Sequence, residues 1–104
     1  MSDLYRAFSE PVRRRALRLL GRGPLCVCDL VDALRLPQPT VSRHLGALTE
    51  AGLVTMSKRG RWRHYALSPR PTALARRLLA SLPHEPASAA DLARLRATAR
   101  PACG

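Results

Sequence analysis

The spacing of apolar positions predicts short amphipathic helices along the first half of the chain. Residues 4–8 form a first short apolar helix, and Ser9, Glu10 and Pro11 then begin a second one that runs to about Gly21, because Ser is a good N-cap and Pro suits the first turn. One face of this second helix carries apolar residues at i, i+4, i+7 and i+8, namely Val12, Ala16, Leu19 and Leu20. The remaining positions carry five arginines, Arg13, Arg14, Arg15, Arg18 and Arg22. We interpret this arginine run as a solvated face.

Two further helices follow, separated by a proline-containing break. We expect the first over residues 27–34, with Val27, Leu30, Val31 and Leu34 on its buried face. Residues 36–39 (LPQP) cannot continue it, because each proline biases its predecessor away from helical geometry. The next helix begins at Gln38 or Thr40, ends near Ala51 before Gly52, and buries Val41, Leu45 and Leu48. Helix, short turn and helix together indicate a helix-turn-helix.

The pattern changes to strand-like alternation over residues 53–67, where a Gly-containing turn predicts a β-hairpin. Four cations stand at its tip with no acid nearby: Lys58, Arg59, Arg61 and Arg63. Such a hairpin is a wing that can lie along a phosphate backbone. Leu74, Leu78, Leu79 and Leu82 predict another helix, and Ser88 with Asp91 resembles a capping box for a last short one.

The predicted fold is therefore mainly α with a β-hairpin wing: a winged helix-turn-helix of about five to six helices. We place the DNA-binding and dimerisation domain at residues 1–83, and a short C-terminal helix with a flexible tail at residues 84–104. A chain of 104 residues buries only a modest core alone and often relies on a partner subunit.

The charge balance favours a polyanionic partner. Eighteen Lys and Arg against seven Asp and Glu give 18 − 7 = +11, and 17 of the 18 cations are Arg. No window approaches 18 uncharged apolar residues, and the N-terminus lacks the basic-then-apolar plan of a secretion signal. These features predict a cytoplasmic protein that does not associate with a membrane.

Two of the three cysteines, Cys26 and Cys28, stand about a dozen residues before the second helix of the helix-turn-helix. An odd number of cysteines without a secretion signal argues against a disulfide framework and favours free thiols, ligands or redox groups. Thiolates select soft, thiophilic ions, while the plainer alternative is two small buried hydrophobes. On an ideal helix these residues lie about 200° apart, so we expect ligand binding to distort the start of the third helix.

The other ionisable residues suggest no catalysis. We interpret Asp29, Asp32 and Glu50 as helix-surface acids. The three histidines lack the i, i+4 spacing of metal ligands on a helix, so His44 and His64 are predicted to contact a DNA groove or backbone and His84 to lie in a loop. Trp62 and Tyr65 are predicted to be packing and backbone anchors rather than base-stacking platforms, because alternation places them on different faces of the hairpin. No nucleophile with a base and no phosphate-cradling loop is present in the sequence, so an enzyme is not expected.

Three motifs resemble the ArsR/SmtB family of winged-helix repressors, specifically its arsenic-responsive branch. Residues 25–30 (LCVCDL) look like that branch's inducer motif, residues 38–45 (QPTVSRHL) like the recognition helix, and residues 60–69 (GRWRHYALSP) like the wing. The resemblance covers roughly residues 3–82. It implies a homodimer, joined mainly through its first and last helices, that binds double-stranded operator DNA and leaves when arsenic(III) or antimony(III) binds. No organic cofactor is implied. The expected DNA contacts are Gln38, Thr40, Ser42, Arg43, His44, Lys58, Arg59, Arg61 and Arg63.

One position departs from that branch, which often carries a third cysteine where this chain has Val31. Arsenic(III) prefers three thiolates, so Cys103 is the remaining candidate ligand beside Cys26 and Cys28. Other interpretations stay open: a thiol redox sensor, a zinc or cadmium sensor of the same fold, or a DNA-binding module without an inducer.

Overall fold

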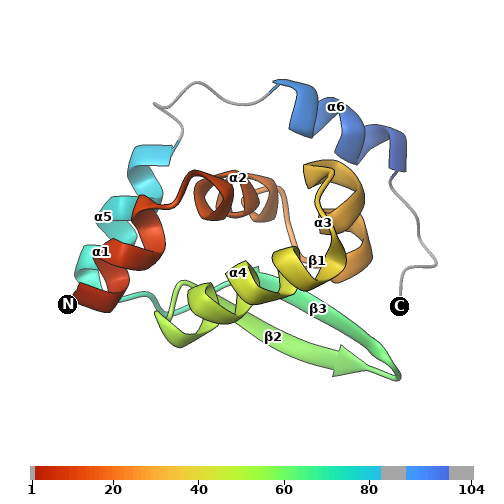
Figure 1. Cartoon of the computed structure of the whole chain (residues 1–104). Coiled ribbons are helices and arrows are strands. Elements are labelled where there is room, and N and C mark those ends of the chain that lie inside the picture. The colour runs from red at the N-terminus through yellow and green to blue at the C-terminus, as the bar shows by residue number, and fades with distance from the viewer. Residues whose placement is uncertain (1, 83–88, 99–104) are drawn as a thin grey trace.

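Six helices and a three-stranded antiparallel sheet make up the part of the chain that the computed structural model describes, residues 2–82 and 89–98 (Figure 1). The helices are α1 (Ser2–Ser9), α2 (Pro11–Leu20), α3 (Val27–Leu34), α4 (Gln38–Glu50), α5 (Ala73–Ser81) and α6 (Ala89–Thr98). The strands are β1 (Leu25–Cys26), β2 (Val54–Arg59) and β3 (Trp62–Leu67). The predicted arrangement of helices around a helix-turn-helix followed by a hairpin is confirmed.

Local signals in the sequence set most of the helix boundaries. α3 has the predicted bounds, and α4 begins at Gln38, the earlier of the two predicted starts. Pro11 opens α2 as expected, but the N-cap is Glu10, because Ser9 instead ends α1. Gly52 follows α4 with a φ of +80°, a conformation that favours glycine.

The hairpin is joined by a third strand that the sequence prediction missed. β2 pairs with β3 in a register that runs from Val54 opposite Leu67 to Arg59 opposite Trp62, around a turn in which Gly60 has a φ of +63°. β1 pairs with the other edge of β3, so the sheet order is β1-β3-β2. A strand of two residues is too short to show alternation in the sequence.

The hydrophobic core lies where α2, α3 and α4 meet the sheet. Its most deeply buried leucines have 0% exposure: Leu17, Leu30, Leu45, Leu48 and Leu53. The predicted stripe on α4 is confirmed, since Val41, Leu45 and Leu48 are all buried. Tyr65 is also buried, whereas Trp62 is 36% exposed on the hairpin. The packing role predicted for this pair therefore holds for Tyr65 only.

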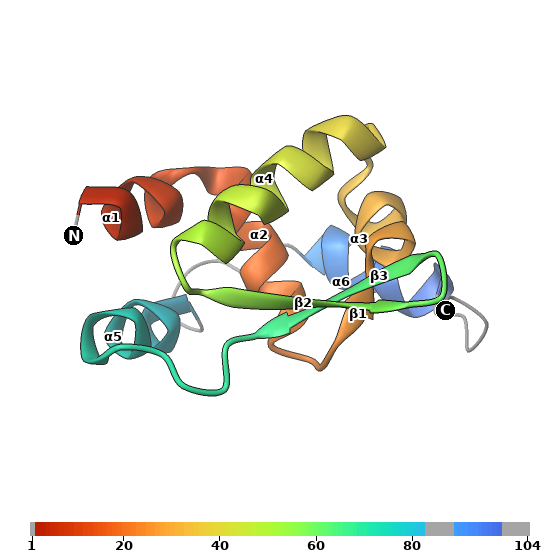
Figure 2. The ribbon, with the colours of Figure 1, turned by 90° about the horizontal axis from the view of Figure 1, so that it is seen from below.

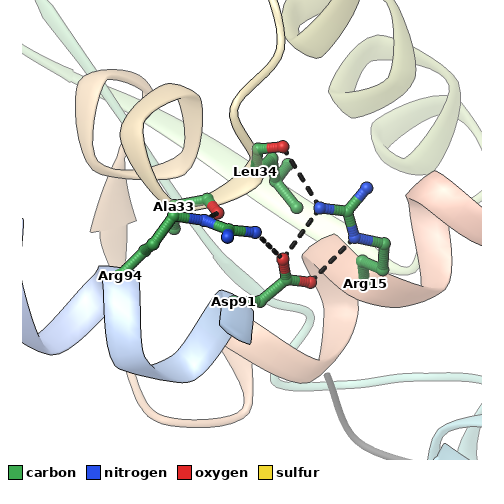
Figure 3. Close-up of polar contacts among 5 residues, drawn as sticks. All are labelled: Arg15, Ala33, Leu34, Asp91 and Arg94. Atoms are coloured by element: carbon green, nitrogen blue, oxygen red, sulfur yellow. Dashed lines mark hydrogen bonds and ion pairs between the residues drawn. The ribbon is translucent and has the colours of Figure 1, made fainter. Parts of the chain in front are cut away.

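α6 docks on α3 and α2 through a buried carboxylate (Figure 3). Asp91, 3% exposed, binds Arg15 with two contacts of 2.8 Å and Arg94 with one of 2.7 Å. The same guanidinium groups donate to the last carbonyls of α3: Arg15 Nη2 to Leu34 O at 3.1 Å, and Arg94 Nε to Ala33 O at 2.7 Å. These carbonyls have no partner within their own helix, so the cluster both caps α3 and holds α6.

The hydrogen bonds of α2 correct one prediction. The arginine run of α2 is not simply a solvated face, because Arg13, Arg14 and Arg15 each donate hydrogen bonds to other elements of the fold. The hydrogen bond to Asp91 raises the pKa of Arg15 above its usual value. Asp91 pairs with Arg15 and Arg94. Ser88, the other residue of the predicted capping box, lies outside the described residues.

α4 and the hairpin lie on the opposite side of the molecule from α6. α4 and the β2–β3 hairpin share one side, at the bottom in Figure 1 and toward the viewer in Figure 2, with α6 on the other side of the molecule. α1 and α5 lie at one end in both views, and the tip of the hairpin lies at the opposite end. Among the described helices, none has the length and apolar character needed to cross a membrane.

Candidate metal centre and nucleic-acid interface

Cys26 and Cys28 lie side by side at the junction of β1 and α3. Cys26 is the N-cap of α3, with extended backbone angles (φ −82°, ψ 162°), and Cys28 lies in the first turn. Their Cα atoms are 5.4 Å apart, and their sulfur atoms are joined in a disulfide. The prediction that the pair must face apart was wrong, because Cys26 precedes the helix and the helical period does not apply to it. Bringing the sulfurs together therefore needs no distortion of α3.

Asp29 is the third polar residue of this site. The two sulfur atoms and a carboxylate oxygen of Asp29 all lie within 4.8 Å of one another, and Cys26 Sγ is 3.5 Å from Asp29 Oδ2. The prediction of a surface acid was wrong: Asp29 is 7% exposed, and its buried Oδ1 has no hydrogen-bond partner among the described residues. The sequence held one signal for the position of Asp29: a side chain three residues after an N-cap residue, here Cys26, points back toward that residue.

The donor set fits a soft, thiophilic ion or metalloid. Two adjacent thiolates are the ligands that such an ion prefers, and the carboxylate adds one oxygen donor. Within the described part of the chain, no other cluster of three potential ligand residues comes together. A disulfide between residues only two positions apart closes a very short loop and restricts few residues of the chain. It is therefore not the disulfide framework against which the odd number of cysteines argued.

A cleft opens beside Cys28. It encloses about 400 Å³ between α3 and the hairpin, and its lining residues are Val27, Cys28, Val31, Asp32, Gln38, Arg61, Trp62 and Arg63. Cys26, 1% exposed, does not line it. The cysteine site is thus closed on the side of Cys26 and Asp29 and open on the side of Cys28.

The histidines stay apart from this ligand cluster. His64 lies opposite Cys26 in the β1–β3 register, and its Nε2 is buried without a hydrogen-bond partner among the described residues. His64 is half-buried, and the DNA contact predicted for it stays a prediction. His84 and Cys103 lie outside the described residues.

α4 presents part of its predicted DNA-reading surface to solvent. Gln38 and Arg43 are exposed, and Thr40 and Ser42 are half-buried. His44 is different: it is buried, and Arg13 Nε donates to its Nδ1 at 3.1 Å. Burial lowers the pKa of His44, and the Arg13 charge lowers it further. His44 therefore serves as a neutral acceptor that ties α4 to α2, which its sequence position on the polar side did not reveal.

The hairpin presents all four predicted cations to solvent: Lys58, Arg59, Arg61 and Arg63 are exposed. Arg61 also lies over the Trp62 ring, with its guanidinium carbon 5.7 Å from the ring centroid, a cation–π arrangement. The two elements that carry these residues, α4 and the β2–β3 hairpin, lie on the side of the molecule that faces the viewer in Figure 2. The arrangement can place a helix in a groove and a basic strand pair along phosphates.

Known proteins are similar to this chain in sequence and in fold. The family described as bacterial regulatory protein, arsR family, matches residues 10–56. An uncharacterized HTH-type transcriptional regulator of Methanocaldococcus jannaschii is 43% identical over 65 residues, covering 62% of this chain and 73% of the relative. The arsenical resistance operon repressor of Escherichia coli K12 is 43% identical over 78 residues, covering 74% of this chain and 67% of the repressor.

A solved structure described as a possible transcriptional regulator for arsenical resistance has a TM-score of 0.65 at 36% identity, covering 94% of this chain and 97% of that one. The winged helix-turn-helix prediction is thereby confirmed. So is the expectation that the chain is not an enzyme, because the family consists of transcriptional regulators. The chain belongs to the arsR family of bacterial regulatory proteins.

Proposed function

We propose that this protein is a cytoplasmic repressor that binds operator DNA as a homodimer and releases it when trivalent arsenic or antimony binds to Cys26 and Cys28. The observation that carries the proposal is the meeting of both sulfur atoms at the β1–α3 junction, next to the helix-turn-helix and the wing. The similarity to the Escherichia coli arsenical resistance operon repressor supports the same inducer class.

In this proposal DNA is held on the side formed by α4 and the hairpin. Arg43 and Ser42, with Gln38 and Thr40, face base edges and nearby phosphates, while Lys58, Arg59, Arg61 and Arg63 contact phosphates through their exposed side chains. The buried position of His44 removes it from the residues we assign to direct contact.

The homodimer is assigned to the end of the molecule where α1 and α5 lie. Tyr5 on α1 is 52% exposed, and Leu74 and Leu78 on α5 are only half-buried. A second copy of the chain would cover these apolar side chains. Their burial would stabilise a chain that is too small to bury much apolar surface alone. The hairpin tip at the opposite end (Figure 1) stays free for DNA.

The ligand acts on DNA binding through the elements that share its site. Cys26 belongs to β1, which pairs with the wing strand β3, and Cys28 belongs to α3, which packs against α4. A ligand shifts the protein only through its differential affinity for two shapes, and DNA must weaken ligand binding by the same factor. Typical coupling of about 1–3 kcal/mol corresponds to about 5–150-fold weaker DNA binding.

Cys103 remains in the proposal as a third thiolate for inorganic arsenic, because Val31 supplies no sulfur next to the pair. The Cys103 thiolate at a given site comes either from the same subunit as Cys26 and Cys28 or from the partner subunit. A truncated chain that ends at Thr98 separates this role from that of the Cys26–Cys28 pair.

The proposed function is tested by measuring DNA release with arsenite, antimonite, zinc, cadmium and peroxide side by side on one operator. A phosphine reductant keeps the thiols reduced in the metal and metalloid arms without binding arsenic as a dithiol would. We expect release by arsenite and antimonite at concentrations where zinc and cadmium have no effect. Release by zinc or cadmium alone would contradict the proposal and point to a divalent-metal sensor.

A thiol redox sensor is the second candidate, because the structure itself joins Cys26 and Cys28 in a disulfide. Oxidation of the two thiols would remove two protons and two electrons and form that bond. In the same experiment this sensor would release DNA with peroxide, recover with reductant and ignore arsenite. No release by any of the five agents would leave a DNA-binding module without an inducer.

The wing predicts a change in salt dependence. Arg59→Ala should weaken binding to all DNA sequences alike and reduce the slope of log K against log salt by about one unit for each phosphate that is no longer neutralised. Arg59 is chosen because Arg61 also stacks on Trp62. Arg70→Ala, an exposed arginine between β3 and α5, is the matched control and should leave the slope unchanged. Equal slopes for Arg59→Ala and wild type would remove this wing residue from the interface.

A further inference from the structure

Arg13 on α2 bonds to two other helices at once. Its Nε donates to Nδ1 of His44 on α4 at 3.1 Å, and its Nη1 donates to the carbonyl oxygen of Arg6 on α1 at 3.4 Å. The second bond is longer and exposed, so the bond to His44 is the stronger of the two. Because a guanidinium holds its donors in one rigid plane, Arg13 fixes α4 relative to both α1 and α2.

His44 lies on the buried side of the helix whose other side we assign to DNA. It is 9% exposed, whereas the next residue before it, Arg43, is exposed. Val41 and Leu45 also anchor α4 in the core, but apolar burial is non-directional. A hydrogen bond depends on angle, so the bond to His44 fixes the rotation of α4 about its axis. Any rotation that freed His44 would turn Arg43 by the same angle.

We propose that Arg13 is a positioning residue for DNA reading: through neutral His44 it fixes the rotation of α4, and it releases α4 when His44 gains a proton. The inference rests on the proposed function, because it takes α4 as the helix that reads DNA. Nδ1 accepts the bond through the lone pair that a proton would occupy. A protonated His44 would also place a second positive charge beside the Arg13 guanidinium.

An open pocket beside this bond gives the Arg13 side chain room to move. The pocket encloses about 250 Å³ between α1, α2 and α4, and its lining residues are Arg6, Ala7, Arg13, Ala47, Glu50 and Ala51. A guanidinium repelled by charged His44 can therefore move into the pocket without displacing the core. The lining includes the carboxylate of Glu50, which favours a cation there.

The surroundings of His44 favour its neutral form. Burial lowers its pKa most, the Arg13 charge lowers it further, and Arg43 adds to this effect, while Glu10 at the N-cap of α2 acts in the opposite direction. α1, α3 and β2 also pack against α4, and among the described residues no charge on them shifts this pKa. The bond is therefore complete above the ordinary histidine pKa of 6.5 and is lost as the pH falls through the lowered pKa of His44.

The test measures how well the reduced full-length protein distinguishes two DNA duplexes. One duplex is selected by the wild-type protein from a random-sequence pool, and the other is a scrambled duplex of the same composition. The ratio of the two affinities is followed by fluorescence anisotropy from about pH 8 to about pH 5, the range in which histidine titrates, at constant ionic strength. Thermal melting at each pH controls for folding.

Three variants separate the roles of the bond. Arg13→Met keeps the stem of the side chain and removes both bonds. His44→Asn keeps an acceptor oxygen near the position of Nδ1 but does not titrate. Arg22→Met is the matched control, because Arg22 is an exposed arginine just after α2 and its loss removes the same charge.

We expect Arg13→Met to lower the affinity ratio by about three- to tenfold at about pH 8, the scale of one hydrogen bond, and Arg22→Met to leave it within about twofold. The wild-type ratio should fall by a similar factor toward about pH 5, while the ratio of His44→Asn stays level. Arg13→Met should also raise the pKa of His44, measured by NMR, because it removes a neighbouring charge.

An affinity ratio for Arg13→Met equal to that for Arg22→Met would overturn the inference, as would a wild-type pH profile equal to that of His44→Asn. If Arg13→Met does not fold, the comparison of these two pH profiles decides alone. A wild-type protein that selects no duplex from the pool would instead refute operator binding, and the proposed function with it. The two failures are therefore distinguishable.

Discussion

Cys26→Ser and Cys28→Ser should each abolish release of operator DNA by arsenite while leaving DNA affinity in the absence of arsenite nearly unchanged. A serine hydroxyl keeps the shape of the side chain but is a hard, neutral donor that does not replace a thiolate toward arsenic. Neither cysteine is among the residues that we assign to DNA contact, and Cys26 is buried. The about 5–150-fold weakening that typical coupling provides should disappear.

The measurement is DNA binding by fluorescence anisotropy across an arsenite titration, with a phosphine as the reductant. Thermal melting of each variant controls for folding, which matters most for Cys26→Ser because its hydroxyl enters a buried position near Asp29. A variant that still releases DNA at the wild-type arsenite concentration would show that its cysteine is not a required ligand.

Asp91→Asn should lower the free energy of unfolding by about 2–3 kcal/mol, the scale of losing charge-assisted hydrogen bonds to a buried carboxylate. The amide cannot balance the guanidinium groups of Arg15 and Arg94, whose side chains are 26% and 27% exposed. This partial exposure to water is why we expect less than the full cost of breaking a buried ion pair. Urea denaturation measures the change.

Glu50→Gln is the matched control, because Glu50 is an exposed acid on α4. It should change stability by less than about 0.5 kcal/mol. Hydrogen exchange adds a local readout: amides at the end of α3 and in α6 should lose protection in Asp91→Asn before those of α4 do. Uniform loss across the fold, or none, would argue against the role of Asp91 in holding α6 on α3.

The sequence was sufficient wherever short-range signals set the structure. Apolar spacing and flanking prolines placed α3 and α4 almost to the residue, and the change to alternation located the hairpin. These features depend on neighbours within a few positions, which a sequence pattern records directly. The cysteine pair was also found from the sequence, because its residue types and spacing are unusual.

Features that depend on distant partners were misjudged. Arg15 and Asp91 are 76 positions apart, so no local pattern connects them, and a run of arginines on a helix ordinarily faces solvent. Asp29 reads as a surface acid until the site is folded around it. The predicted orientation of the two cysteines was wrong for a related reason. β1 forms only by pairing with β3, so the extended backbone of Cys26 could not be inferred from residues 25–30 alone.

The placement of the cysteines at a strand end and a helix cap bears on how such a regulator can diversify. Positions 26, 28 and 31 lie outside α4 and outside the hairpin tip. Under the proposed function, substitutions there would change which inducer is sensed and leave the operator sequence unchanged. β1 contributes only two residues to the sheet, and the longer β2–β3 ladder supplies most of the pairing of the wing. Under the same proposal, a lineage would acquire a new chemical signal for an existing set of genes through a few changes at one edge of the sheet.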